Sequence, residues 1–162
     1  MSESFGEKIK KWCMEDGIFK QEIIDHEKYS FCYMIEYFGM PLMVYEQKSH
    51  PDTVYVHVYI NIPEEYVKKI HDMENKMKYK FAERLTMYFI SRVEFHIEWK
   101  NSCTPISLEF YRRIFYESLD RQEFFKAVWK VGNVLSGIKW IFTGWIPEVK
   151  LFKFDPNTSM YN

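Results

Sequence analysis

The spacing of hydrophobic residues changes several times along the chain, and the order of these changes predicts the fold. Near the start, Ser4 and Glu7 form a capping-box pattern, in which each side chain can satisfy a free backbone donor at a helix N-terminus. Phe5, Ile9 and Trp12 then recur at helical spacing. We therefore expect a first helix over Ser4–Asp16.

The next segments alternate between apolar and polar residues with the two-residue period of strands. This alternation predicts strands over Lys28–Phe38, Leu42–Gln47 and Thr53–Ile60. A shorter run, Ile18–Ile24, leaves it open whether there are three strands or four. Short connections rich in Gly and Pro join the strands, so we expect an antiparallel meander.

Helical spacing returns at Pro63 and continues to Arg92, either as one long helix or as two helices with a break near Asn75. Val93–Lys100 and Pro105–Glu117 are predicted to form a two-strand hairpin, in which Arg112 interrupts the apolar positions and suggests a bulge or an emergence from the core. A last helix is expected to begin at Asp120.

These elements predict an α+β fold: a helix, a three- or four-strand antiparallel meander, a long helix, a two-strand hairpin and a C-terminal helix, with one sheet backed by helices. No repeat or linker divides the 162 residues, so we expect a single domain over 1–162. The apolar residues of 147–162 suggest a tail that docks as an extra strand or crosses to a second subunit.

Composition narrows the possible functions. The formal net charge is -1, which gives no electrostatic signature of nucleic-acid binding. Polar residues interrupt the longest apolar segment, Val128–Ile146, so no membrane span is expected. The three cysteines include no C-x-x-C pair, which fits a reducing cytoplasm.

The residue patterns contain no catalytic, cofactor or metal signature. No two of the five histidines have metal-ligand spacing, and no phosphate-binding glycine loop occurs. His57 and His96 are predicted to share one sheet face with Glu94 and Glu98, so a site for a metal, a small molecule or catalysis there is an alternative. A polar sheet face that simply points towards water explains the same pattern. We therefore expect no cofactor and no enzymatic activity.

Aromatic residues, at 19% of the chain, suggest a contact surface for a protein partner. Trp129, Trp140 and Trp145 near the last helix raise the same possibility. Ordinary half-exposed tyrosines on a sheet are the alternative explanation. The predicted partner-binding residues on the second sheet face are Tyr55, His57, Tyr59, His96 and Tyr111.

The order of the elements resembles the fold of type III secretion chaperones and their cytoplasmic relatives, and also an archaeal family of uncharacterised proteins. The resemblance covers nearly the whole chain and includes the stretches Val54–Pro63 and Pro105–Leu108. It implies a small homodimer that binds peptide segments of other proteins. Secretion chaperones are markedly acidic whereas this chain is nearly neutral, so a role in secretion is not inferred. The resulting expectation is a non-enzymatic, dimeric module that binds a protein or peptide.

Overall fold

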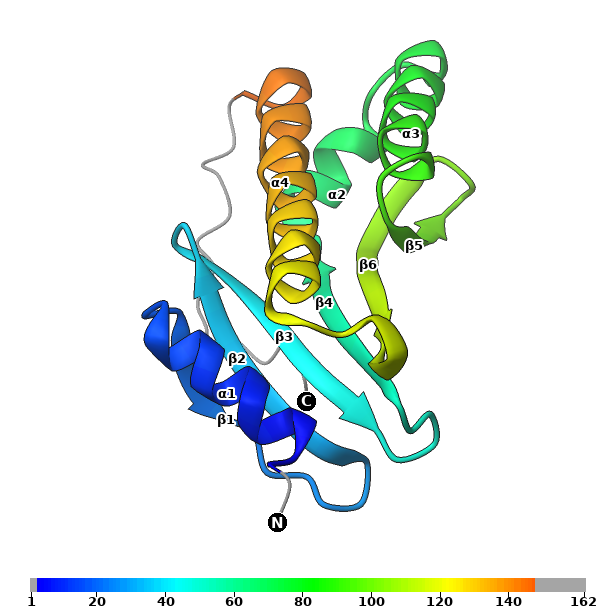
Figure 1. Cartoon of the computed structure of the whole chain (residues 1–162). Coiled ribbons are helices and arrows are strands. Elements are labelled where there is room, and N and C mark those ends of the chain that lie inside the picture. Colours follow the sequence, from blue (N-terminus) through cyan, green and yellow to red (C-terminus); the bar gives the residue numbers. More distant parts are fainter. Residues whose placement is uncertain (1–2, 148–162) are drawn as a thin grey trace. The chain divides into compact units, whose positions relative to one another are not determined.

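The computed structural model describes residues 3–147, which form six strands and four α-helices (Figure 1). The strands form one antiparallel sheet in the order β1-β2-β3-β4-β6-β5, and helices back it. The α+β layout predicted from the sequence is therefore confirmed. The elements are α1 (Phe5–Glu15), β1 (Phe19–Glu22), β2 (Tyr29–Tyr37), β3 (Met40–Gln47), β4 (Thr53–Asn61), α2 (Glu64–His71), α3 (Asn75–Ile90), β5 (Glu94–Lys100), β6 (Thr104–Phe115), a 3-10 turn (Tyr116–Ser118) and α4 (Arg121–Trp145).

Two compact units make up the chain. Unit 1 contains the residues up to Val58 together with Tyr111–Gly132. Unit 2 contains Tyr59–Phe110 and the chain from Asn133 onwards. The boundary falls within β4, β6 and α4, so each of these elements contributes to both units.

In unit 1, α1 and the first half of α4 cover one face of the meander. Ser4 caps α1 with the predicted capping box. Helix α1 lies over β1 and β2 (Figure 1), and Gly6 allows the close approach, because a Cβ at that position would lie 2.8 Å from the Phe31 ring. Lys10 lies over the Tyr33 ring in the same layer. From Phe31 onwards, the odd-numbered residues of β2 therefore face the helices and the even-numbered residues form the second face. Tyr29 precedes a shift in strand register and lies on the second face, where its ring is 5.1 Å from that of Tyr45.

Unit 2 has an aromatic core between α2, α3, the second half of α4 and the hairpin strands. Phe142 of α4 contacts Tyr66 of α2 and Phe81 of α3, with ring centroids 5.8 and 5.3 Å apart. Phe89 of α3 stacks on Phe95 of β5 and packs against Phe110 of β6. Burial of such rings stabilises the unit by the hydrophobic effect and by edge-to-face, stacked and tilted ring contacts.

The structure resolves the alternatives left by the sequence. The run Ile18–Ile24 contains a strand, β1, which pairs antiparallel with β2, so the meander has four strands. The helical stretch after Pro63 is two helices, because Glu74 adopts an extended conformation (φ -55°, ψ 143°) between α2 and α3. Strand β6 continues through Arg112 to Phe115. Residues 148–162 of the predicted tail lie outside the described residues.

Candidate functional site

Three residues of the predicted contact surface lie together on the second face of unit 1. The ring of Tyr55 stacks on Tyr45 at 5.2 Å, and His57 lies edge-on to Tyr45 at 5.6 Å. Tyr111 of β6 contacts both Tyr55 and His57, at 5.8 and 6.1 Å. The structure therefore brings three of the five predicted residues together, and their role in binding stays a prediction.

This face is not a solvated surface, contrary to one expectation for His57. Only 7% of His57 and 6% of Tyr45 is exposed, and Cys32 and Met43 on the same face are still more deeply buried. The apolar neighbours explain the difference, because Cys32, Met34, Met43 and Tyr45 form a hydrophobic cluster of their own. The alternation of apolar and polar residues in a strand does not by itself show whether the second face of the sheet is exposed to water or buried.

The other predicted residues belong to unit 2. Tyr59 donates a hydrogen bond through its hydroxyl to the side chain of Asn61 at 3.2 Å, and His96 is exposed on β5. Strand β6 lies between β4 and β5, so His57 and His96 are not on neighbouring strands. Among residues 3–147, no cluster of His, Cys, Asp and Glu could hold a metal ion. A site at His57, His96 and Glu94 stays a prediction.

Two buried cysteines are unsuited to act as nucleophiles, because they are inaccessible and their thiols stay protonated. Cys13 and Cys32 are completely buried, and burial raises the pKa of each thiol to about 12. Neighbouring Asp16 adds to the shift at Cys13. A reactive cysteine needs a thiolate at neutral pH, so both thiols are structural.

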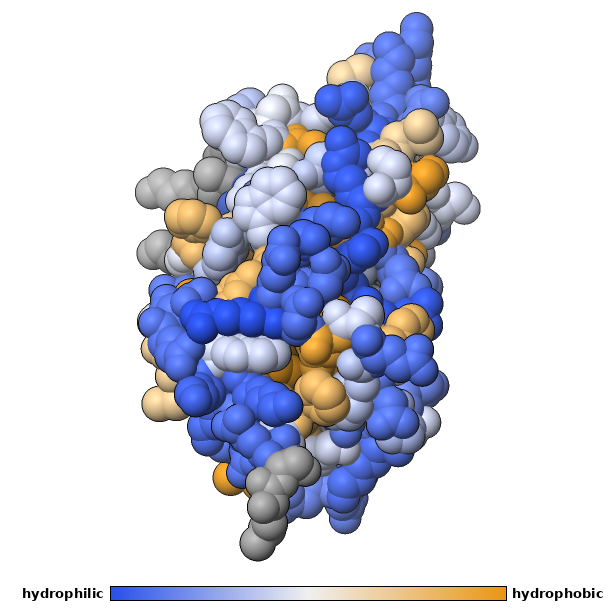
Figure 2. All heavy atoms as spheres, viewed as in Figure 1, coloured by the Kyte–Doolittle hydropathy of each residue, from blue (hydrophilic) through white to orange (hydrophobic). Residues whose placement is uncertain are grey.

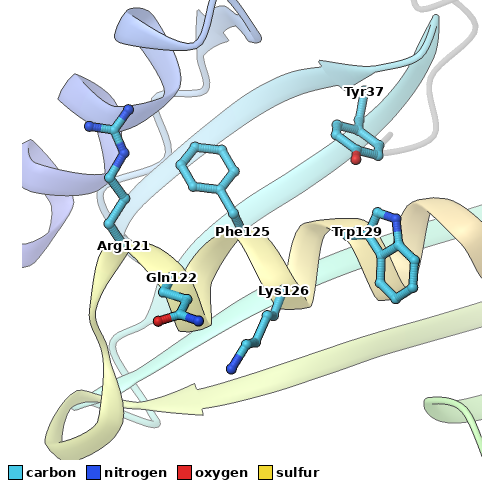
Figure 3. Close-up of a pocket in the computed structure, with 6 residues that line it drawn as sticks. All are labelled: Tyr37, Arg121, Gln122, Phe125, Lys126 and Trp129. Carbon is cyan, nitrogen blue, oxygen red and sulfur yellow. The ribbon is translucent and has the colours of Figure 1, made fainter.

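An aromatic pocket lies beside α4 in unit 1, with a volume of about 570 Å³ (Figure 3). In Figure 3, Arg121 and Phe125 rise from one side of α4, and Tyr37 from the end of β2 lies beyond Phe125. Gln122, Lys126 and Trp129 follow the neighbouring stripe of the helix at spacings of four and three residues. We call these six residues the aromatic pocket.

The first turn of α4 fixes the position of these residues. The side chain of Asp120 accepts a hydrogen bond from the backbone N–H of Glu123 at 2.8 Å, which satisfies a free donor at the helix start. Arg121 forms ion pairs with Glu15 and Asp16 at the end of α1, at 2.7 and 2.8 Å. The guanidinium thus links α4 to α1.

A glycine on α4 brings Tyr37 close to the helix. A Cβ at Gly132 would lie 2.7 Å from the Tyr37 ring, so only a glycine permits this contact. The tyrosine ring therefore packs directly against the helix backbone and forms one wall of the aromatic pocket.

An exposed phenylalanine lies next to this wall. Phe38 has φ 49° and Gly39 has φ 73°, so both residues are left-handed in the turn between β2 and β3. Asn, Asp and Gly normally occupy such positions because a bulky side chain is strained there. Phe38 is nevertheless 83% exposed, and its ring contacts Tyr37 at 4.6 Å.

Sequence reasoning did not identify the aromatic pocket, although two signals pointed to it. Trp129 lies outside the buried stripe of the last helix, and it is 54% exposed. Gly132 lies within a helical pattern where Ala is favoured, which often indicates close packing. The contribution of Tyr37 depends on a tertiary contact and has no local signature.

The surface seen in Figure 2 is mainly hydrophilic, with apolar side chains visible between polar ones. None of the helices within residues 3–147 is sufficiently long and hydrophobic to cross a membrane.

Fold and site together define an α+β protein with a helix-backed antiparallel sheet and an aromatic pocket beside its last helix. Residues 5–142 match the family model described as an uncharacterized conserved protein, DUF2299. The chain belongs to this family.

A solved structure has the same fold. It is the crystal structure of an uncharacterized protein from Methanothermobacter thermautotrophicus, an archaeon, with a TM-score of 0.78 and 18% sequence identity. The similarity covers 85% of this chain and 96% of that one. A comparison with curated proteins gives no match.

Proposed function

We propose that this protein is a non-enzymatic module that binds a peptide segment of another protein in the aromatic pocket. The observation that carries the proposal is Trp129, which leaves about half of its surface exposed beside an open pocket lined by Tyr37 and Phe125. Trp, Tyr and Arg are the residues that most often dominate binding energy at protein interfaces. The pocket combines all three types in unit 1.

The lining suits a peptide with an apolar anchor. The rings of Phe125 and Trp129 offer apolar area, and rigid aromatic side chains lose little conformational entropy when a ligand binds. The Gln122 amide and the Trp129 indole N–H can form hydrogen bonds with a peptide backbone. These groups explain how the pocket would accept an extended segment.

The conformation of Phe38 supports the same proposal. A bulky residue in the left-handed region costs about 1 kcal/mol or more, and an exposed phenylalanine gains little from burial to offset this cost. Strained residues that persist in folds are concentrated at functional sites. Because Phe38 packs on Tyr37, we propose that it extends the contact surface of the pocket.

A chaperone-like role and a homodimer are part of the proposal, and the resemblance to type III secretion chaperones supports both. Exposed apolar side chains on α3 offer a place for subunit contact, since Met87 and Ile90 lie one turn apart and are each about 60% exposed (61% and 58%). Sedimentation equilibrium at micromolar concentration tests the dimer. A dimer mass is expected, and a monomer would contradict this part of the proposal.

Selection from a displayed library of random twelve-residue peptides tests the binding function. The full chain is the bait, and the enriched peptides are expected to contain an aromatic or proline anchor. Trp129→Ala should weaken binding of an enriched peptide at least about tenfold, as expected for an interface hot spot.

Trp140→Ala is the matched control, because it removes a second exposed tryptophan of α4 that does not line the aromatic pocket. It should leave the affinity unchanged. Equal losses in the two variants, or no enriched peptide, would overturn the proposed function.

A further inference from the structure

A second pocket of unit 1 has a strongly basic lining. It has a volume of about 200 Å³ and lies between the end of β6 and the first half of α4. Four cationic side chains line it together with a single carboxylate, that of Glu123. We call it the basic pocket, and its cations are Arg112, Arg113, Lys126 and Lys130.

This local charge contrasts with the chain as a whole, whose formal net charge is -1. The pocket's carboxylate is already engaged, because Glu123 accepts a hydrogen bond from Lys126 at 2.6 Å. Arg112 and Lys130 form no ion pair with a carboxylate of residues 3–147. Grouped like charges repel one another, and they are stabilised when an anion binds between them.

Arg112 is a charged residue at a position of β6 where the alternation of the strand would place an apolar one. It follows Leu108 and Phe110, which are completely buried on the same face of β6, and it is itself half-buried. Ala127, which is buried, forms an apolar part of the same lining. A partly desolvated guanidinium binds a carboxylate more strongly than one fully in water, and it can do so through two parallel hydrogen bonds.

The two pockets share one residue, Lys126, which lines both. An extended peptide that places its anchor beside Trp129 can therefore continue around α4 into the basic pocket. We infer that the peptide partner is acidic, and that a carboxylate side chain next to its apolar anchor binds Arg112 and Lys130 in the basic pocket. The inference rests on the proposed function and specifies the chemistry of the partner.

The probe for this inference is a fluorescein-labelled hexaglutamate peptide, with labelled hexalysine for comparison. Fluorescence anisotropy measures binding to the full chain in 50 mM salt. Hexaglutamate is expected to bind and hexalysine is not. The double variant Arg112→Gln, Lys130→Gln should weaken hexaglutamate binding at least tenfold, and the affinity should fall as salt is raised.

The charge-matched control is Lys68→Gln with Lys76→Gln, which removes two exposed lysines from α2 and from the start of α3. Thermal unfolding of each variant establishes that it remains folded. An equal loss of affinity in the control would mean that net charge alone drives binding, and would overturn the inference. A second titration uses inorganic phosphate at millimolar concentration. If the pocket binds phosphate but not hexaglutamate, its ligand is a free anion, and the inference of an acidic peptide partner is wrong.

Failure of this inference differs from failure of the proposed function. If hexaglutamate binding is independent of Arg112 and Lys130 while enriched peptides still require Trp129, only the acidic partner is excluded. If enriched peptides do not require Trp129 while hexaglutamate requires the two cations, the aromatic pocket is excluded as the docking site.

Discussion

At the residue scale, the turn between β2 and β3 shows how a single side chain can conflict with its backbone. Four non-glycine residues within residues 3–147 have a positive φ, and three of them are small or polar: Asp52, Asn101 and Ser102. Phe38 is the exception, at φ 49°. Its strain is explained if the exposed ring contacts a partner.

Two substitutions at Phe38 separate two effects on the free energy of unfolding: the strain of the left-handed backbone and the loss of the phenylalanine ring. Both Phe38→Asn and Phe38→Val remove the contact with Tyr37, but Asn tolerates the left-handed region and a β-branched Val does not. We expect the Asn variant to be more stable than the Val variant by about 1 kcal/mol. Chemical denaturation measures the difference, and equal stability would show that the turn is not strained.

The buried thiols predict how stability depends on alkaline pH. Burial keeps Cys13 and Cys32 protonated in the folded state up to a pKa of about 12, whereas their ordinary pKa is 9.0. Between these values the unfolded chain binds fewer protons than the folded protein, so the free energy of unfolding decreases as pH rises. The contribution is on the order of 1 kcal/mol per cysteine at pH 10.

The measurement is the free energy of unfolding from pH 7 to pH 10.5, compared with a Cys13→Ala, Cys32→Ala variant. The loss in the wild type should exceed that in the variant, because the two proteins differ only in the two thiols. If stability falls equally with pH in the wild type and in the variant, the pKa values of the two thiols are not raised in the folded protein. Thiol-specific reagents should also leave both cysteines unmodified at pH 8 until the protein unfolds.

At the element scale, the glycines of α4 show which helix contacts depend on a missing side chain. An alanine at Gly132 would clash with the Tyr37 ring at 2.7 Å, and one at Gly137 would clash with the Tyr88 hydroxyl at 1.7 Å. Tyr88 donates a hydrogen bond to the backbone carbonyl of Asn133 at 3.3 Å, which holds it against the helix. A Cβ at Gly144 meets nothing within 4 Å.

These contacts reverse the usual effect of alanine in a helix. Gly144→Ala should stabilise the protein by up to about 1 kcal/mol, as helix propensity predicts. Gly132→Ala and Gly137→Ala should each destabilise it by about 1–3 kcal/mol because of overpacking. Thermal unfolding of the three variants tests this, and a stabilising Gly132→Ala would contradict the close approach of Tyr37.

The elements themselves were largely predictable because their patterns are local. Alternation in Thr53–Ile60 and the capping box at Ser4 require only neighbouring residues, and the structure confirms both elements. The sequence left open whether α2 and α3 are one helix, because polar residues around Asp72 fit either a continuous helix or a link. Burial of His57 was not predictable, since it depends on tertiary contacts with Tyr45 and Tyr111 on neighbouring strands.

At the scale of the whole molecule, the candidate site combines segments that are distant in sequence. Tyr37 comes from the β2 end, Phe125 and Trp129 come from α4, and Arg112 comes from β6. No sequence period relates these residues, so pattern analysis placed the contact surface on the strand tyrosines and raised Trp129 only as a second possibility. In the sequence, Trp129 is only a residue outside the buried stripe of the last helix, and Arg112 is only an interruption of the apolar positions of β6.

The family and the fold do not themselves establish what the protein binds. The structural neighbour shares the architecture at 18% identity, which is evidence for the fold alone. The proposed function depends instead on side chains of unit 1 and on their exposure. Its central claim is that a peptide binds beside Trp129.

Nuclear magnetic resonance of the tryptophan indole N–H groups tests this claim most directly. The chain has five tryptophans, so five indole signals are expected, and the Trp129→Ala and Trp140→Ala variants assign two of them. On titration with an enriched peptide, the Trp129 signal should shift until saturation while the Trp140 signal remains in place. A Trp129 signal that does not move at saturating peptide would contradict the account.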